Sequence, residues 1–172
     1  MFEIKSEKQI LGMLEPRKSV ISNRTEIPEL DGSYLSYVLG FKGMEITPDI
    51  VLFDYDEALR ENRYLAGQSE EISERLWHIG ASGQGDGWFM DRVEGFVLFF
   101  DHDQGDYLSL PQFESLGIGF DDFLKLAFLY RELENLLDVR DPAAGEVTLF
   151  KSAVNRLKPG LYGLYPFNYF EN

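Results

Sequence analysis

The stretch from Leu76 to Phe100 limits the possible folds of this chain more than any other segment. It contains strand patterns at Leu76 to Ala81, Trp88 to Met90 and Gly95 to Phe100. The sequence SGQGDG between the first two holds three glycines in six residues, and glycine adopts the backbone angles of a tight turn at no steric cost. A second turn is expected at Asp91 to Glu94. Tight turns join antiparallel neighbours, so the segment predicts an antiparallel meander.

A long helix is expected after the loop that follows these strands. Apolar side chains recur at helical spacing from Phe120 to Leu137, and Asp121 and Asp122 lie near its start, where the helix dipole favours acidic groups. The hydrophobic period changes from 2 residues in the strands to 3.6 in this segment, so the helix should pack on the sheet. We therefore expect an α+β fold with a central, mostly antiparallel sheet and flanking helices.

Three further helices are predicted before the meander. Ser6 with Gln9, and Asp54 with Glu57, have the spacing of a capping box, in which the first side chain accepts a hydrogen bond at the start of a helix. Apolar residues also recur at helical spacing from Leu30 to Phe41.

Shorter segments are assigned from their composition. Ile50 to Phe53 is a β-prone run, whereas the polar stretch from Gly67 to Glu74 is expected to be solvated surface. Near the end of the chain, Glu146 to Phe150 is β-prone, and a short helical stretch follows it up to Leu157.

The chain of 172 residues shows no internal repeat and no low-complexity linker, which favours a single compact body. Its character changes after Asp141, so residues 1–140 are expected to form the main domain and residues 141–172 a C-terminal extension. The extension ends in an aromatic run, Leu161 to Phe170, which would expose a large apolar patch if it stayed free. We therefore expect the extension to pack on the same domain.

Composition argues against several classes of protein. The chain has 16 Lys and Arg against 30 Asp and Glu, a formal net charge of −14, and a field of that sign repels nucleic acid and anionic membranes. Cysteine is absent, which excludes disulfides and thiolate metal sites. No secretory signal is visible, and no apolar run approaches the roughly 20 residues of a membrane helix. We expect a cytoplasmic protein that binds neither nucleic acid nor membrane.

Two ligand-binding motifs are approached but not met. The glycine-rich turn has Asp86 where a phosphate-binding loop requires lysine, so no nucleotide cofactor is expected. The run DHDQGDY, from Asp101 to Tyr107, resembles a calcium loop, but Gly105 and Asp106 are exchanged and Gln112 stands in place of the bidentate glutamate. We therefore expect neither a metal site nor a cofactor.

Catalytic residue types are present without a recognisable pattern. His78 or His102 could activate Ser82, but Ser82 lacks the G-x-S-x-G frame of a hydrolase nucleophile. Asp86 could face Asp91 or Glu94 across a hairpin, yet such carboxylate pairs arise by chance in so acidic a chain. We expect a protein that is not an enzyme, with a hydrolase built on Ser82, His78 or carboxylates as one alternative.

Several segments occur in a characteristic order: IPELDGSYLSYVLGFKG, IVLFDYDEALRENR, WHIGASGQGDGWFMD, GFVLFFDHDQGDY and FESLGIGFDDFLKLAF. The most specific elements are the strand that leads into Gly85 to Gly87, the aromatic strand that ends at Asp101 and His102, and the closing helix. This order resembles the SUKH superfamily, which includes bacterial toxin-immunity proteins and fungal regulators of cell-wall synthesis. The resemblance spans about Ile27 to Leu137 and implies an α+β protein-binding scaffold.

The resemblance implies an immunity protein that neutralises a cognate toxin, with an intracellular adaptor of the same superfamily as the alternative. An acidic scaffold suits a basic toxin, for example a nuclease. Asp86, Asp101, Asp103 and Asp106 are predicted at the rim of the contact because they lie on loops at strand ends, and Trp88 is predicted as an aromatic anchor inside it. Alternatively, these acids are only solvated and the partner binds elsewhere, for example on the extension.

Overall fold

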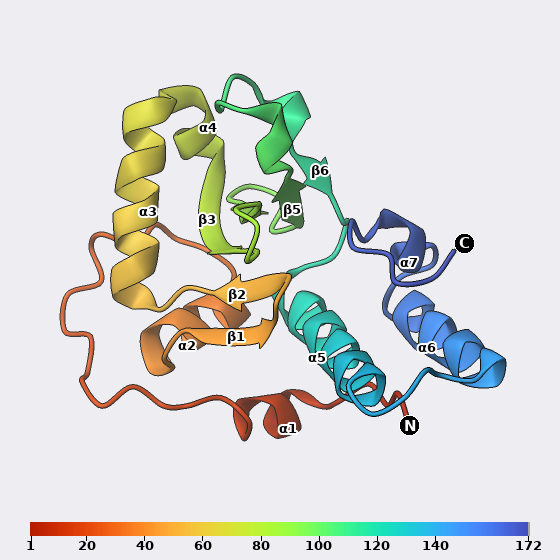
Figure 1. Ribbon diagram of the computed structural model, residues 1–172. Coiled ribbons are helices and arrows are strands. Elements are labelled where there is room, and N and C mark those ends of the chain that lie inside the picture. Colours follow the sequence, from red (N-terminus) through yellow and green to blue (C-terminus); the bar gives the residue numbers. More distant parts are fainter. Residues whose placement is uncertain (172) are drawn as a thin grey trace.

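A computed structural model, which describes residues 1–171, has a six-stranded sheet at its centre (Figure 1). Every neighbouring pair of strands is antiparallel, and each strand is hydrogen-bonded to the next one along the chain. The strands are β1 (Met44–Thr47), β2 (Ile50–Leu52), β3 (Leu76–Ala81), β4 (Gly87–Asp91), β5 (Val97–Phe100) and β6 (Glu114–Ser115). This arrangement confirms the α+β class and the antiparallel meander.

The central strands send alternate side chains into two hydrophobic clusters, because successive residues of a strand point to opposite faces of the sheet. Trp88 and Met90 of β4 belong to the larger cluster, whereas Phe89 between them belongs to the smaller one. Leu65 and Ile72 cover the smaller cluster from neighbouring helices. Both faces of the sheet are therefore covered, which explains why every residue of β4 is buried.

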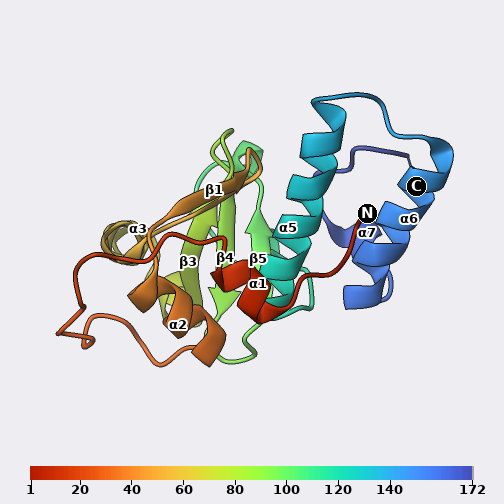
Figure 2. The same ribbon diagram turned by 90° about the horizontal axis from the view of Figure 1, so that it is seen from below.

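The helices pack around this sheet. They are α1 (Glu7–Leu11), α2 (Gly32–Gly40), α3 (Tyr55–Gln68), α4 (Glu70–Arg75), α5 (Phe120–Leu137), α6 (Ala144–Leu157) and α7 (Leu161–Leu164). Figure 2 shows α3 and α6 at opposite ends of the molecule, with the sheet and α5 between them. The ring of Phe123 on α5 lies 4.9 Å from that of Trp88, centroid to centroid. The expected bounds of this helix and its packing on the sheet are confirmed.

Local hydrogen bonds explain where several helices begin. The Ser6 hydroxyl accepts from the backbone N–H of Gln9, and the Gln9 side chain accepts from the backbone N–H of Ser6. The Asp54 carboxylate accepts from the backbone N–H of Glu57 at 2.9 Å and so caps α3. Asp31 caps α2 in the same way. The full capping box is present at Ser6, whereas at Asp54 only the first of its two hydrogen bonds is formed; both caps satisfy N–H groups that the helix itself leaves free.

Two segments differ from the prediction. The stretch expected to be solvated surface contains most of α4. Ser69 caps this helix by accepting a hydrogen bond from the N–H of Ile72, and the Ile72 side chain is fully buried. The β-prone run near the end of the chain is part of α6 instead of a strand, because Phe150, Ala153 and Val154 share one buried face of a helix. In both places, burial against distant segments outweighs weak local propensity.

The described residues of the C-terminal extension belong to the same hydrophobic core as the main domain. Helix α6 lies beside α5, on the side away from the sheet (Figure 2). Tyr130 of α5 contacts both Phe150 and Tyr165, with ring centroids 5.0 and 4.1 Å apart. Tyr165 also stacks on Trp88. The aromatic end of the extension is thus packed against α5 and the sheet up to residue 171, and Asn172 lies outside the described residues.

Within residues 1–171, no helix combines the length and the apolar composition that crossing a bilayer requires.

Candidate functional site

Three of the predicted partner-binding residues lie on one exposed loop at the end of β5. We call residues 101–107 the acidic loop; it contains the single-turn helix η1 (His102–Gln104). The side chains of Asp101, Asp103 and Asp106 are exposed, as the sequence predicts for a loop at a strand end. The acidic loop lies beside the glycine-rich turn between β3 and β4, because His102 is hydrogen-bonded to Asp86 of that turn.

Hydrogen bonds hold the acidic loop in one shape. Asp101 caps η1 by accepting from the backbone N–H of Asp103 at 2.9 Å, and Gly105, with φ of 77°, ends it. Gln112 accepts from the backbone N–H groups of Leu108 and Ser109, and its amide donates to the carbonyl of Asp106 at 3.1 Å. Gln112 therefore braces the segment from the position where a calcium loop would carry a ligating glutamate.

Asp86 joins the glycine-rich turn to the acidic loop. One carboxylate oxygen accepts from the Ser82 hydroxyl at 2.7 Å, and the other accepts from the backbone N–H of His102 at 3.1 Å and from its ring Nδ1 at 2.6 Å. The Asp86 side chain is only 5% exposed, whereas that of His102 is 43% exposed. We call this pair the Asp86–His102 latch.

The latch perturbs the titration of both partners. Burial raises the pKa of Asp86, but hydrogen bonds from His102 and Ser82 outweigh burial, and the net pKa lies below its usual value. The hydrogen bond to Asp86 raises the pKa of His102 above its usual value, and the nearby carboxylates add to this effect. The latch is therefore an ion pair under mildly acidic conditions.

The catalytic arrangement considered from the sequence is not assembled. Asp86 stands between Ser82 and His102, so the Ser82 hydroxyl donates to a carboxylate and contacts no imidazole that could remove its proton. The other histidine, His78, is buried and stacks on Phe89 with ring centroids 4.2 Å apart. Burial lowers the pKa of His78 to about 4.

The proposed carboxylate pair is also not formed. Asp91 follows Asp86 by five residues along β4, which places the two roughly 16 Å apart on an extended strand. Paired catalytic carboxylates lie within about 10 Å of each other. Asp91 instead binds the guanidinium of Arg75 and caps the next turn by accepting from the N–H groups of Val93 and Glu94. It is a structural residue of the β4–β5 turn.

One group of potential metal ligands occurs among residues 1–171. Donor atoms of Asp86, Asp101 and His102 all lie within 4.8 Å of one another. The Nδ1 atom of His102 is already hydrogen-bonded to Asp86, so an ion would have to replace that proton. Neither Asp103 nor Asp106 belongs to this group. Exposed acidic groups often lie this close together in proteins without binding an ion, so this cluster alone is not evidence for a metal site.

Two of the predicted partner-binding residues need correction. Trp88 is fully buried between α5 and the extension, and its indole N–H donates to the carbonyl of Asp49 at 2.8 Å. It therefore has no surface to offer a partner. Asp86 is also buried and uses its carboxylate within the latch, so it cannot form the rim of a contact. Only Asp101, Asp103 and Asp106 are placed where a partner could reach them.

A residue absent from the sequence prediction lies next to the acidic loop. Tyr64 projects from α3 with 59% of its surface exposed. It contributes to a hollow of about 180 Å³ between α3 and the acidic loop. We call this the loop hollow; its lining is Tyr64, Gln68, Gly85, Phe100, His102, Gly105, Asp106 and Tyr107. The helical spacing of α3 indicates that Tyr64 lies outside the buried face of the helix, but it does not indicate which loop Tyr64 faces.

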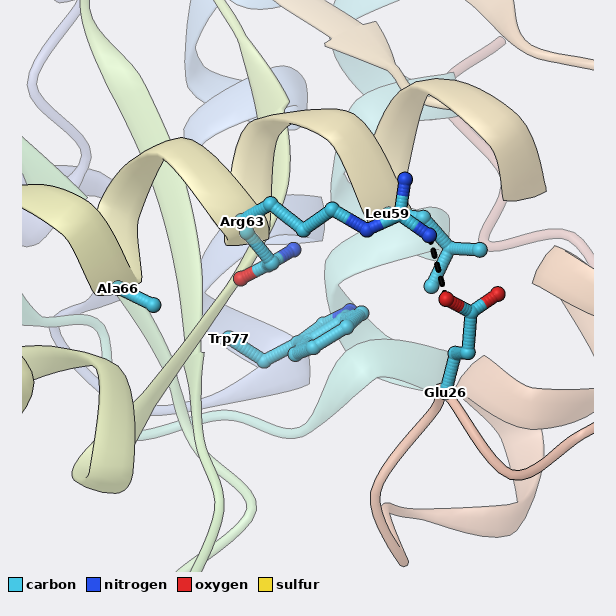
Figure 3. Close-up of a pocket in the computed structure, with 6 residues that line it drawn as sticks. Glu26, Leu59, Arg63, Ala66 and Trp77 are labelled. Carbon is cyan, nitrogen blue, oxygen red and sulfur yellow. Dashed lines mark hydrogen bonds and ion pairs between the residues drawn. The ribbon is translucent and has the colours of Figure 1, made fainter.

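A second hollow, of about 290 Å³, lies under another side of α3 (Figure 3). The flat indole of Trp77 lies below the helix, with Leu59 and Ala66 beside it, and Arg63 reaches from α3 toward Glu26 to form an ion pair at one end. The Trp77 N–H donates to the hydroxyl of Tyr34 at 2.9 Å, so Trp77 itself presents only apolar ring surface to the space, which Asn62 also lines. We call this the Trp77 hollow.

Comparisons of the chain with models of protein families, with curated proteins and with solved structures found no match. Its function therefore has to be inferred from its residues and their geometry.

Proposed function

We propose that this chain is a non-enzymatic protein-binding domain that neutralises a basic partner through the acidic loop, as an immunity protein does for a toxin such as a nuclease. The observation that carries the proposal is the position of Asp101, Asp103 and Asp106. All three carboxylates are exposed on one loop, and hydrogen bonds to Asp86 and Gln112 hold the backbone of that loop in place. The SUKH-like order of segments supports the same reading.

Charge supports this role through the rate and selectivity of association. The formal net charge is −14, and the three exposed aspartates lie within six residues of one another. The Debye length is about 10 Å at 0.1 M salt, so neighbouring carboxylates act together on an approaching cation. Complementary fields of this kind can raise association rates by about 10- to 1000-fold at low salt.

A braced loop also suits tight binding. Ordering a flexible segment during association costs free energy that is subtracted from the affinity. Here Gln112 already holds the carbonyl of Asp106, and the latch already holds His102. The loop therefore presents its carboxylates without a large further loss of conformational entropy.

The direct test uses the partner encoded beside this gene. We expect a neighbouring gene for a large secreted toxin, and we expect co-expression of this chain to restore growth of cells that produce the toxin domain. Asp103→Lys with Asp106→Lys should slow association of the purified proteins about tenfold or more at low salt and weaken its salt dependence.

The matched control changes the same total charge at a distance from the loop. Asp138 and Asp141 are exposed beyond the end of α5, and their replacement by lysine should alter association much less than the change in the acidic loop. Equal effects of the two double variants would refute the assignment of the acidic loop as the contact rim.

An adaptor of the same superfamily is the second candidate function. An adaptor would use the same binding surface but would not have a toxin as its partner. Two findings together would favour the adaptor: no toxin gene beside this one, and capture of the chain in a regulatory complex. An immunity role against a nuclease would require the chain to act in the cytoplasm, where the toxin meets nucleic acid.

A further inference from the structure

We propose that the loop hollow receives an arginine side chain of the partner protein. This inference rests on the proposed function, because it names the group that enters the acidic surface. It adds a specific pocket to what would otherwise be a general attraction between opposite charges.

The loop hollow offers aromatic surface of two kinds. The Tyr107 ring is held against Phe100 and Phe113, with centroids 4.7 and 6.0 Å away, so one wall has a set position. Tyr64 on α3 contributes a second ring that is largely exposed. Burial raises the pKa of Tyr107, with Tyr64 and Glu61 adding to the effect, so its hydroxyl keeps its proton at neutral pH. Neutral aromatic faces attract cations.

The loop hollow also carries negative charge, because Asp106 is one of the residues that line it. The Asp106 carboxylate is exposed and forms no ion pair within residues 1–171. The basic side chain in the lining of the loop hollow, His102, is already paired with Asp86. An incoming cation therefore finds a free carboxylate.

Arginine fits this lining better than an apolar group or lysine. The guanidinium is planar, stacks on aromatic rings and donates up to five hydrogen bonds, whereas lysine offers a compact, strongly hydrated charge. Besides its aromatic residues, the loop hollow is lined by Gln68, Asp106, Gly85 and Gly105, which carry hydrogen-bonding groups. The Trp77 hollow also has charged residues in its lining, but there Glu26 is already paired with Arg63, so an incoming cation would not find a free carboxylate.

A titration with a small probe tests the pocket without the natural partner. The ¹H–¹⁵N NMR spectrum of the full chain should be followed with N-acetyl-arginine methylamide and with the neutral citrulline analogue of the same shape. Arginine should shift the amides of Tyr64, Gln68, Gly85 and the acidic loop with a Kd on the order of 1 mM, a modest affinity for one side chain. Citrulline should shift these amides at least about fivefold less at the same concentration, because its urea group carries no positive charge to interact with the aromatic rings and Asp106.

Two variants make the test specific. Tyr64→Ala and Asp106→Asn should each raise the Kd about two- to fivefold, the range typical of an exposed cation–π contact or ion pair. Arg63→Ala, at the Trp77 hollow on the same helix, should leave the Kd unchanged. Equal shifts with citrulline, shifts spread over the whole acidic surface, or full binding by Tyr64→Ala would overturn the proposal.

The result separates the pocket from the proposed function. Tyr64→Ala keeps every charge of the acidic loop. If the loop reversals slow partner association but Tyr64→Ala neither weakens the complex nor reduces arginine binding, the binding function stands and the arginine pocket is refuted.

Discussion

Replacing Asp86 with alanine is expected to release the acidic loop and to destabilise the whole domain. In the native protein, Asp86 is buried and accepts hydrogen bonds from the Ser82 hydroxyl and from both the backbone and the ring of His102. Alanine removes all three acceptor contacts at once. The loop then loses its attachment to the turn between β3 and β4.

The size of the effect follows from the groups that lose a partner. The Ser82 hydroxyl is buried, and leaving such a group unsatisfied costs about 1–3 kcal/mol. The backbone N–H of His102 loses a hydrogen bond to a charged acceptor, although water can reach this exposed residue and offset part of the loss. We expect Asp86→Ala to lower the free energy of unfolding by about 2–4 kcal/mol.

Urea unfolding followed by tryptophan fluorescence measures this quantity, with the slope compared to verify two-state behaviour. Asp103→Ala serves as the control, because Asp103 is 85% exposed and its loss should change the unfolding free energy by less than about 0.5 kcal/mol. Hydrogen exchange of the amides from 101 to 107 should speed up in Asp86→Ala alone. A loss below about 1 kcal/mol, or a loss no larger than that of the control, would show that the latch is not what holds the loop.

Three further predictions concern pH, the extension and calcium. Because the pKa of His102 is raised, its contribution to the free energy of unfolding is complete below the ordinary histidine pKa and is lost as pH rises through the raised value. Because the pKa of Asp86 is lowered, its contribution is complete above the ordinary aspartate pKa and is lost as pH falls through the lowered value. The difference in unfolding free energy between the native protein and Asp86→Ala, measured in urea from pH 3 to 9, gives the contribution of the latch. This difference should be greatest under mildly acidic conditions, and a difference that does not change with pH would contradict the prediction. Tyr165→Ala should lower the free energy of unfolding by about 3–5 kcal/mol because the ring is buried. Tyr165→Phe should leave it unchanged, because the hydroxyl has no hydrogen-bond partner within residues 1–171. Thermal unfolding compares the two variants, and an alanine variant as stable as the native protein would show that the extension is not part of the core. Calorimetry with calcium should detect no micromolar site, since Gln112 braces the loop in place of a ligating glutamate, and micromolar binding would refute this.

Local patterns in the sequence were enough to predict a large part of the fold. The capping spacing of Ser6 with Gln9 and of Asp54 with Glu57 predicted two helix starts, because such hydrogen bonds form between residues three positions apart. The glycine-rich turn predicted the β3–β4 hairpin, and the change of hydrophobic period predicted α5 with its observed bounds. Exposure of Asp101, Asp103 and Asp106 also followed from their position on a loop after a strand.

The sequence by itself determined these elements and the acidic character of the surface, whereas burial was decided by the tertiary structure. Nothing near Trp88 in the sequence shows that α5 and the extension cover it, and Asp86 looks like any loop acid until His102 is brought beside it. Tyr64 meets the acidic loop only because α3 packs along that side of the sheet. Propensity and capping act over one helical turn, but burial depends on contacts between segments far apart in the chain, and those contacts determine which acids and aromatic rings a partner can reach.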